Sequence, residues 1–450
     1  SWELAVINQF YTPAWIVKTL VDNTLGRLWL QMHPDSSLHA SEPPPLPGER
    51  SGEVPVADYL VPRTGEKIRF QRLTETGEAQ TWKRACDITL IDPACGTMHF
   101  GQYAFGLFHR MYLDEIEHAG QEGWPAEPSV AEVGAIPAAI LENNLFGIDI
   151  DPRAIQIASL SLLLTAKEAA LRDGLSPRDV QVKRTNLVVA NAVDLGEDRL
   201  RTLVERLGSD GSPALRARLF ETLWDNLRHV GELGSLVQVR EGITRILDEW
   251  VEAEAHAKGL TRILQPTDED QLELGDLRTE AARAHAEQLA LERKALAEEA
   301  AALRRELLAA VETAAASVAD DPADRLFAED TARGLKLVQL LSRRYDVAVM
   351  NPPYGAFVPR VRDFVKAVYP LTSNNIYATF IDRACQLTEP GGYVGALVPS
   401  TFMQPKSFEK LRTEILLKRN PLILMLDLGF GILDDATVET AAIAIRGGTL

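Results

Sequence analysis

Short apolar runs alternate along the chain with longer stretches of helical periodicity. Seven runs rich in aliphatic residues and bounded by turn residues predict buried strands, at residues 88–91, 145–148, 187–190, 347–350, 393–398, 422–426 and 441–445. Helical periodicity fills most of the intervals, as at 100–112, 152–172 and 375–387. Strands that alternate with helices predict an α/β fold built on one sheet.

Two segments interrupt this alternation. Residues 34–82 are mostly polar with a proline-rich stretch at 42–48, which predicts a surface excursion. Residues 196–340 predict one helix after another, and their heptads are too irregular for a coiled coil. A helical hairpin inserted between two strands is the simpler interpretation, and a partner-binding arm is the alternative. The expected units are therefore 1–33 (an N-terminal helical element), 34–82, 83–195 (one half of the sheet domain), 196–340 (the insertion) and 341–450 (the other half).

Acidic residues stand where the first two of these strands end. Asp92 opens a turn of small residues, where a ligand can approach backbone amides and an acid can bind a cation or amine. The second strand ends in Asp149-Ile150-Asp151, and Pro152 begins a helix. Asp151 is the expected N-cap of that helix, which leaves Asp149 to bind ribose hydroxyls.

The fourth strand runs into Asn351-Pro352-Pro353-Tyr354. Two prolines cannot continue a ladder, so the Asn351 side chain is expected at the strand's carboxyl end, where ligands of open α/β sheets bind. The Asn351 amide oxygen and the Pro352 carbonyl are acceptors that can grip the two N–H bonds of an exocyclic ring amine. Tyr354 offers an aromatic face on which a base taken out of a duplex can stack. The competing interpretation is a turn without chemistry.

Composition narrows the possible partners. The net charge of −17 argues against strong binding of DNA by this chain alone. Arg360, Arg362 and Lys366 form a basic cluster after the proline pair, although solvated helix faces explain such clusters as often. No apolar run suggests a membrane span. The three cysteines lie far apart without metal-ligand spacing, so a reduced, cytoplasmic protein without a metal is expected.

Seven motifs follow one another along the chain: QFYTP, DPACGT, FGIDID, VVANA, NPPY, NIYATFIDRACQLTEPGGYVGALVPS and DDATVETAAIAI. Taken in order, these motifs resemble those of gamma-class DNA methyltransferases that act on adenine N6. The resemblance covers the chain outside 34–82 and 196–340, and it is closest to the large methyltransferases of the BREX and DISARM phage-defence systems. Type I and fused type II modification enzymes share the arrangement.

The resemblance implies a Rossmann-like, seven-stranded class I methyltransferase sheet with a large helical insertion, and S-adenosylmethionine as cofactor. The implied cofactor-binding residues are Tyr11, Thr12, Pro13, Asp92, Ala94, Cys95, Gly96, Asp149, Ile150 and Asn191. Of these, the turn at 92–96 cradles the methionine part, Asp149 the ribose, and Ile150 and Asn191 the adenine. The implied catalytic residues are Asn351, Pro352, Pro353 and Tyr354.

Three positions depart from the family's pattern. Met98 stands where a second glycine is usual, and Asn191 replaces an acid. The late loop often supplies an aromatic that packs on the flipped base; Phe430 is the candidate, with Leu433 as the alternative.

The implied activity is methyl transfer to N6 of a flipped adenine in double-stranded DNA, within a restriction or phage-defence system. Methylation of an RNA base or of a glutamine side chain is the alternative chemistry, and a DNA- or partner-binding scaffold is the alternative class. The chain ends at Gly447-Gly448-Thr449-Leu450, where the family's target-recognition domain would begin. A recognition domain or partner subunits outside the chain are therefore expected. Replacing residues 205–335 by a short linker is expected to preserve cofactor binding.

Overall fold

The computed structural model describes residues 12–39, 57–61, 72–73, 79–80, 82–190, 201, 213–257, 288, 291–292, 294–302, 305, 334, 336–433 and 438–448. Their contacts divide the chain into two compact units. We call them the sheet unit, which is Ser1–Asn191, Gly231–Leu236 and Arg343–Leu450, and the helical unit, which is Ala192–Val230 and Val237–Ser342.

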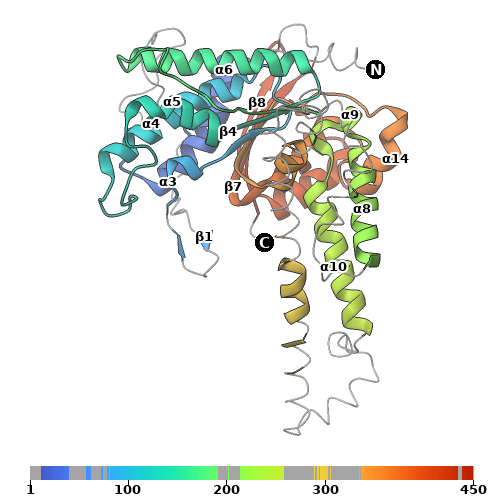
Figure 1. The fold of residues 1–450 in the computed structure, drawn as a ribbon. Helices are drawn as coiled ribbons and strands as arrows, with labels where there is room; N and C mark the ends of the chain where they lie inside the picture. The colour runs from blue at the N-terminus through green and yellow to red at the C-terminus, as the bar shows by residue number, and fades with distance from the viewer. Residues whose placement is uncertain are drawn as a thin grey trace, which may run out of the picture. The chain divides into compact units, whose positions relative to one another are not determined.

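Seven strands form the main sheet of the sheet unit, in the order β5-β4-β3-β6-β7-β9-β8 (Figure 1). They are β3 (Leu90–Asp92), β4 (Leu145–Asp149), β5 (Asn186–Val189), β6 (Tyr345–Met350), β7 (Thr388–Pro399), β8 (Leu422–Gly429) and β9 (Thr440–Arg446). The pairs from β5 to β7 are parallel, and β9 runs antiparallel to both β7 and β8. This is the topology of class I S-adenosylmethionine-dependent methyltransferases, so the predicted fold and all seven predicted strands are confirmed.

The order of the sheet fixes where a ligand can bind. The chain proceeds from β3 outward to β4 and β5, and then returns to β6 on the other side of β3. Connections that leave adjacent parallel strands in opposite directions open a crevice at their carboxyl ends. Asp92, Asp149 and Asn351 stand at or directly after the ends of β3, β4 and β6.

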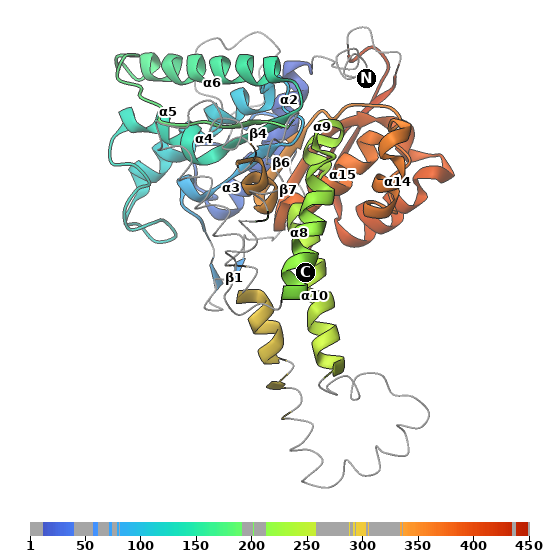
Figure 2. The same cartoon turned by 45° about the vertical axis from the view of Figure 1, so that its right-hand side comes forward.

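Helices cover both faces of the sheet. Figure 2 shows α2 (Ala14–Val21), α4 (His99–His118) and α6 (Pro152–Arg172) to one side of the strands, and α14 (Pro359–Val368) and α15 (Ile376–Leu387) to the other. The shorter helical elements of this unit are η1 (Asp22–Gly26), α3 (Arg27–Met32), η2 (Ala85–Asp87), η3 (Val133–Ala135), α5 (Ile136–Ala139), η4 (Ile140–Asn144), η8 (Ser400–Met403), η9 (Lys406–Phe408) and η10 (Leu411–Arg419). Two short strands, β1 (Arg72–Leu73) and β2 (Ala79–Gln80), pair with each other.

Part of the expected surface excursion packs on the N-terminal helices. Asp22 and Asn23 lie in a π-helical turn and are buried. The backbone N–H of Tyr59 donates to Asp22 Oδ2 at 2.8 Å, and that of Val61 donates to Asn23 Oδ1 at 2.9 Å. Residues 57–61 therefore satisfy polar groups that would otherwise be buried without partners.

Helix α6 begins as the sequence predicts, because the side chain of Asp151 accepts from the N–H of Arg153 at 2.9 Å. By length and composition alone, α6 could cross a membrane, and it is the one such helix among the described residues. That finding corrects the expectation that no segment is apolar enough. The helix instead packs on α4, α5, β4 and β5, and its outer face exposes several leucines, so it is a partly buried helix of the sheet unit.

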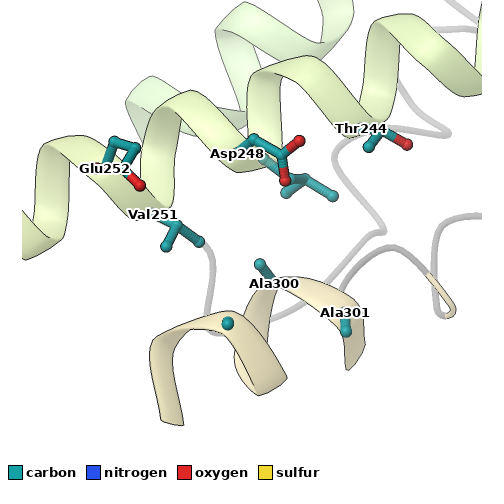
Figure 3. A pocket seen from close by; sticks show the side chains of 8 residues that line it. Thr244, Asp248, Val251, Glu252, Ala300 and Ala301 are labelled. Atoms are coloured by element: carbon teal, nitrogen blue, oxygen red, sulfur yellow. The ribbon is translucent and has the colours of Figure 1, made fainter. Parts of the chain in front are cut away.

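The described residues of the helical unit are mainly helical. Helix α8 (Pro213–Leu227) packs on α10 (Val239–Ala257), and residues 294–302 are also helical. A pocket of about 340 Å³ opens between α10 and residues 294–302, and Figure 3 shows Asp248 and Glu252 at its lining. None of the motif residues lines it. Between α8 and α10, the end of α9 (Val230–Leu233) and η5 (Gly234–Leu236) belong to the sheet unit instead. The remaining domain boundaries stay predictions.

Candidate active site at the carboxyl ends of β3, β4 and β6

The turn after β3 is built around backbone amides. Asp92 is buried, and its Oδ1 accepts from the N–H of Ala94 at 3.1 Å. Gly96 has φ +51°, a left-handed conformation that suits glycine. A Cβ at this position would have no atom within 4 Å, so the turn borders open space on that side.

Asp149, at the end of β4, is tied to that turn. Its Oδ2 accepts from the N–H of Gly96 at 2.8 Å, and its Oδ1 accepts from the N–H of Asp151 at 2.9 Å. Only 7% of the residue is exposed. The two backbone amides therefore fix the carboxylate and leave its remaining lone pairs for a ligand.

The electrostatics of these two acids suit a cationic ligand. Burial raises the pKa of Asp149, and it raises that of Asp92 well above its usual value. Each carboxylate would be stabilised by a nearby positive charge or by donated hydroxyls. S-adenosylmethionine carries a sulfonium, an ammonium and two ribose hydroxyls, so the residues present fit this cofactor.

Met98, the departure from the glycine pattern, is buried with φ +66°. Its side chain fills space that two glycines leave open. A Cβ on Gly101 would lie 2.6 Å from Met98 Cε, and one on Gly147 would lie 3.1 Å from Met98 Sδ. Met98 therefore packs under the turn, against α4 and β4.

The part of the site that is predicted to hold the target base brings the QFYTP motif next to the NPPY motif. Asn351 Nδ2 donates to Thr12 Oγ1 at 3.0 Å, and the Tyr354 hydroxyl donates to Asn351 Oδ1 at 2.9 Å. Thr12 accepts from the amide nitrogen and Tyr354 donates to the amide oxygen, so these two residues set the orientation of the Asn351 amide. Thr12 and Asn351 are 339 residues apart in the sequence.

Tyr354 is more enclosed than the sequence predicts. The residue is 9% exposed, its ring meets that of Tyr377 edge to face, and burial raises the pKa of its hydroxyl. Its hydroxyl also lies 3.4 Å from the carbonyl of Leu397. In this structure the tyrosine hydroxyl orients Asn351, and the predicted role of the ring in stacking stays a prediction.

Phe430, the residue predicted to stack on the flipped base, directly follows β8 and is exposed to solvent. It is 67% exposed and lies between Gly429 and Gly431, which have φ +69° and +76°. Leu433, the alternative, is buried. Of the remaining predicted residues, Tyr11 and Asn191 lie outside the described residues.

One residue that contacts the turn after β3 was not predicted from the sequence. Ser235, in η5, donates its hydroxyl to the carbonyl of Pro93 at 2.6 Å, directly beside Asp92. A signal was present, because Gly231 and Gly234 interrupt an otherwise helical stretch. Glycines inside a helical pattern often mark a turn or a close approach of the backbone.

Two known proteins are similar to this chain along nearly its whole length. The chain is 26% identical over 465 aligned residues to the adenine-specific methyltransferase BrxX of Escherichia coli O9:H4 (strain HS), covering 99% of this chain and 31% of that protein. It is 24% identical to the adenine-specific methyltransferase PglX of Lacticaseibacillus casei (strain Zhang), covering 99% of this chain and 30% of that protein. The chain thus spans about a third of the length of these relatives.

Two solved structures resemble the chain at low similarity. The DrdV–DNA complex has a TM-score of 0.41 and 13% identity, with 98% of this chain and 26% of that chain covered. The ATP-dependent type ISP restriction-modification enzyme LlaBIII bound to DNA has a TM-score of 0.42 and 11% identity, with 97% and 18% covered. The family match is independent of these structures and spans residues 143–430. With more than half of its length matched, the chain belongs to the Eco57I restriction-modification methylase family.

Proposed function

We propose that this chain transfers a methyl group from S-adenosylmethionine to N6 of adenine in DNA, as the modification component of a restriction or phage-defence system. The observation that carries the proposal is the oriented Asn351 amide at the end of β6, beside the acid-lined turn after β3. The two longer relatives are adenine-specific methyltransferases by name, which supports the same substrate.

The chemistry asks for positioning more than for proton transfer. Held by Asp92 and Asp149, S-adenosylmethionine would supply a methyl group on a sulfonium, which the amine nitrogen would take by in-line displacement as the C–S bond breaks. The amine's lone pair is delocalised into the ring, so the Asn351 oxygen and the Pro352 carbonyl would bind its two N–H bonds and favour a pyramidal nitrogen. The amide oxygen has two lone pairs, so it can accept from the base while it accepts from Tyr354. Water takes the proton that the product amine releases.

Phe430 is the residue we assign to stacking on the flipped base, with Tyr354 as the second aromatic of the site. Its exposure and the two left-handed glycines beside it leave its ring available to a base. A base outside the duplex loses the stacking of its neighbours, and an aromatic face replaces part of it.

Recognition of a DNA sequence requires more than this site. The net charge is −17, and Arg360 of the basic cluster is paired with Glu232. We therefore propose that a target-recognition domain or partner subunits supply the basic surface and read the bases. The proposal places the protein in the cytoplasm, with its cysteines reduced.

Methyl transfer should be measured with radiolabelled S-adenosylmethionine on plasmid DNA, ribosomal RNA and a release-factor-like protein in parallel. Incorporation into DNA alone, lost in Asn351→Ala, is the expected result. Incorporation into RNA or protein in preference to DNA would replace the proposed substrate. Cofactor binding without any methyl transfer, when the chain is assayed together with the recognition domain or partner subunits, would indicate a scaffold that has kept the fold.

A further inference from the structure

A short piece of the insertion returns to the sheet unit. We call residues 231–236 the return segment; α8 and α10 flank it in the sequence, but its contacts group it with the sheet. Leu233, Ser235 and Leu236 are buried. The hydroxyl of Ser235 donates to the carbonyl of Pro93 at 2.6 Å, which attaches the segment to the turn after β3.

Buried side chains of the catalytic half hold the other face of the return segment. Arg383, on α15, is 0% exposed, and its Nε donates to the carbonyl of Ser235 at 2.9 Å. The hydroxyl of Tyr369, which is also buried, donates to the carbonyl of Leu236 at 2.6 Å. A guanidinium is costly to bury without acceptors, so the return segment satisfies a charge of the sheet unit itself.

The same segment reaches the residue that follows Asp149. Gly234 has φ +55°, and a Cβ at this position would lie 3.0 Å from Ile150 Cγ2. Ile150 is only partly buried, although its neighbours in β4 are fully packed. A backbone that lies this close to Ile150 limits where its side chain can point.

We propose that the return segment is a wall of the cofactor's adenine pocket, with Gly234 holding Ile150 against the adenine ring and Ser235 fixing the Pro93 turn. The inference rests on the proposed function, because it takes Asp149 and Ile150 as the ribose and adenine contacts. It makes the insertion a contributor to cofactor binding. A chain without residues 205–335 would then lack the wall.

The test compares two glycine substitutions in the full chain. Gly234→Ala adds a methyl group that must displace Ile150, whereas Gly174→Ala introduces the same left-handed strain at φ +75° with no atom within 4 Å. Calorimetry should show S-adenosylmethionine binding weakened about tenfold, or 1.4 kcal/mol, in Gly234→Ala and unchanged in Gly174→Ala. Binding of 5′-methylthioadenosine, which lacks the amino-acid part, should weaken by the same factor.

Other outcomes would separate a failure of the proposed wall from a failure of the proposed function. Equal affinities in Gly234→Ala and Gly174→Ala would overturn the wall and leave the proposed function standing. Failure of the wild-type chain to bind either ligand would overturn the cofactor assignment itself. If Gly234→Ala does not fold, Ser235→Ala takes its place: weaker binding of both ligands by a common factor supports the wall, and unchanged binding overturns it.

Discussion

The candidate active site has two sides, one proposed to bind the cofactor and one the target base, and different kinds of hydrogen bonds hold them. On the cofactor side, backbone amides of Ala94, Gly96 and Asp151 donate to the buried carboxylates of Asp92 and Asp149. On the target side, side chains bind one another, as Thr12 and Tyr354 do with Asn351. These backbone donors lie in the turns that follow β3 and β4 and cannot change rotamer, whereas side chains can. The cofactor side is therefore preorganised, and the target side can rearrange when a base enters.

Asn351→Ala tests the target side most severely. The substitution removes one of the two acceptors for the amine, so methyl transfer to DNA should fall at least about 100-fold, as when one positioned group at a reacting centre is lost. Cofactor affinity should stay nearly unchanged. Single-turnover assays measure the first effect and calorimetry the second. Retention of more than a few per cent of the activity would rule out the two-acceptor mechanism.

Asp149→Ala is the matching substitution on the cofactor side. Loss of charged hydrogen bonds to the ribose should weaken S-adenosylmethionine binding by about 1–3 kcal/mol. Asp151→Ala is the control, because it removes the N-cap of α6 and costs the fold about 1 kcal/mol without touching the proposed ribose contact. Equal affinities for the two variants would remove Asp149 from the site.

Tyr354→Phe separates orientation of the amide from stacking. The ring stays and the hydrogen bond to Asn351 Oδ1 is lost, so kcat should fall by about 2- to 13-fold, the equivalent of 0.5–1.5 kcal/mol. The KM for the cofactor should not change. Tyr377→Phe loses a bond to Thr401 and leaves Asn351 untouched. A kcat loss as large in this control would show a general packing effect.

The comparison also predicts a difference in pH dependence. Burial raises the pKa of Asp149, so this carboxylate is protonated at a higher pH than an ordinary aspartate. Because the cofactor prefers the ionised carboxylate, acidification weakens its binding. The ratio of wild-type to Asp149→Ala affinity should therefore shrink as pH falls from about 8 to about 5. Binding measurements across that range check it. A constant ratio would mean that Asp149 does not titrate with ligand binding.

Much of the frame could be predicted from the sequence. Buried parallel strands are nearly continuous apolar runs, and β6 is buried along its whole length before Asn351. The acids at the ends of β3 and β4 were predictable for the same reason, since each follows such a run directly.

What the sequence did not reveal depends on contacts between distant segments. The bond between Thr12 and Asn351 and the buried ion pair of Lys83 with Asp346 at 2.6 Å arise only once the sheet has assembled. The two glycines of the return segment mark a break in the helical pattern, but nothing in the sequence shows that the segment packs on the sheet unit. Replacing residues 205–335 would take the Ser235 carbonyl away from Arg383, so the proposed wall predicts weaker cofactor binding in that variant, whereas the sequence alone predicts that binding is preserved.

Met98 has a consequence for how this family can diversify. The unbranched Met98 side chain fits in this left-handed position because Gly101 has no side chain to oppose it: all three atoms nearest to a Cβ at Gly101 would belong to Met98. The two positions are thus one unit of sequence variation. Homologues with glycine at the position of Met98 should be free to carry alanine or serine at position 101, whereas homologues that keep the methionine should not. Position 147 should stay glycine in both groups, because a Cβ there would also lie 2.7 Å from Leu187 Cδ2.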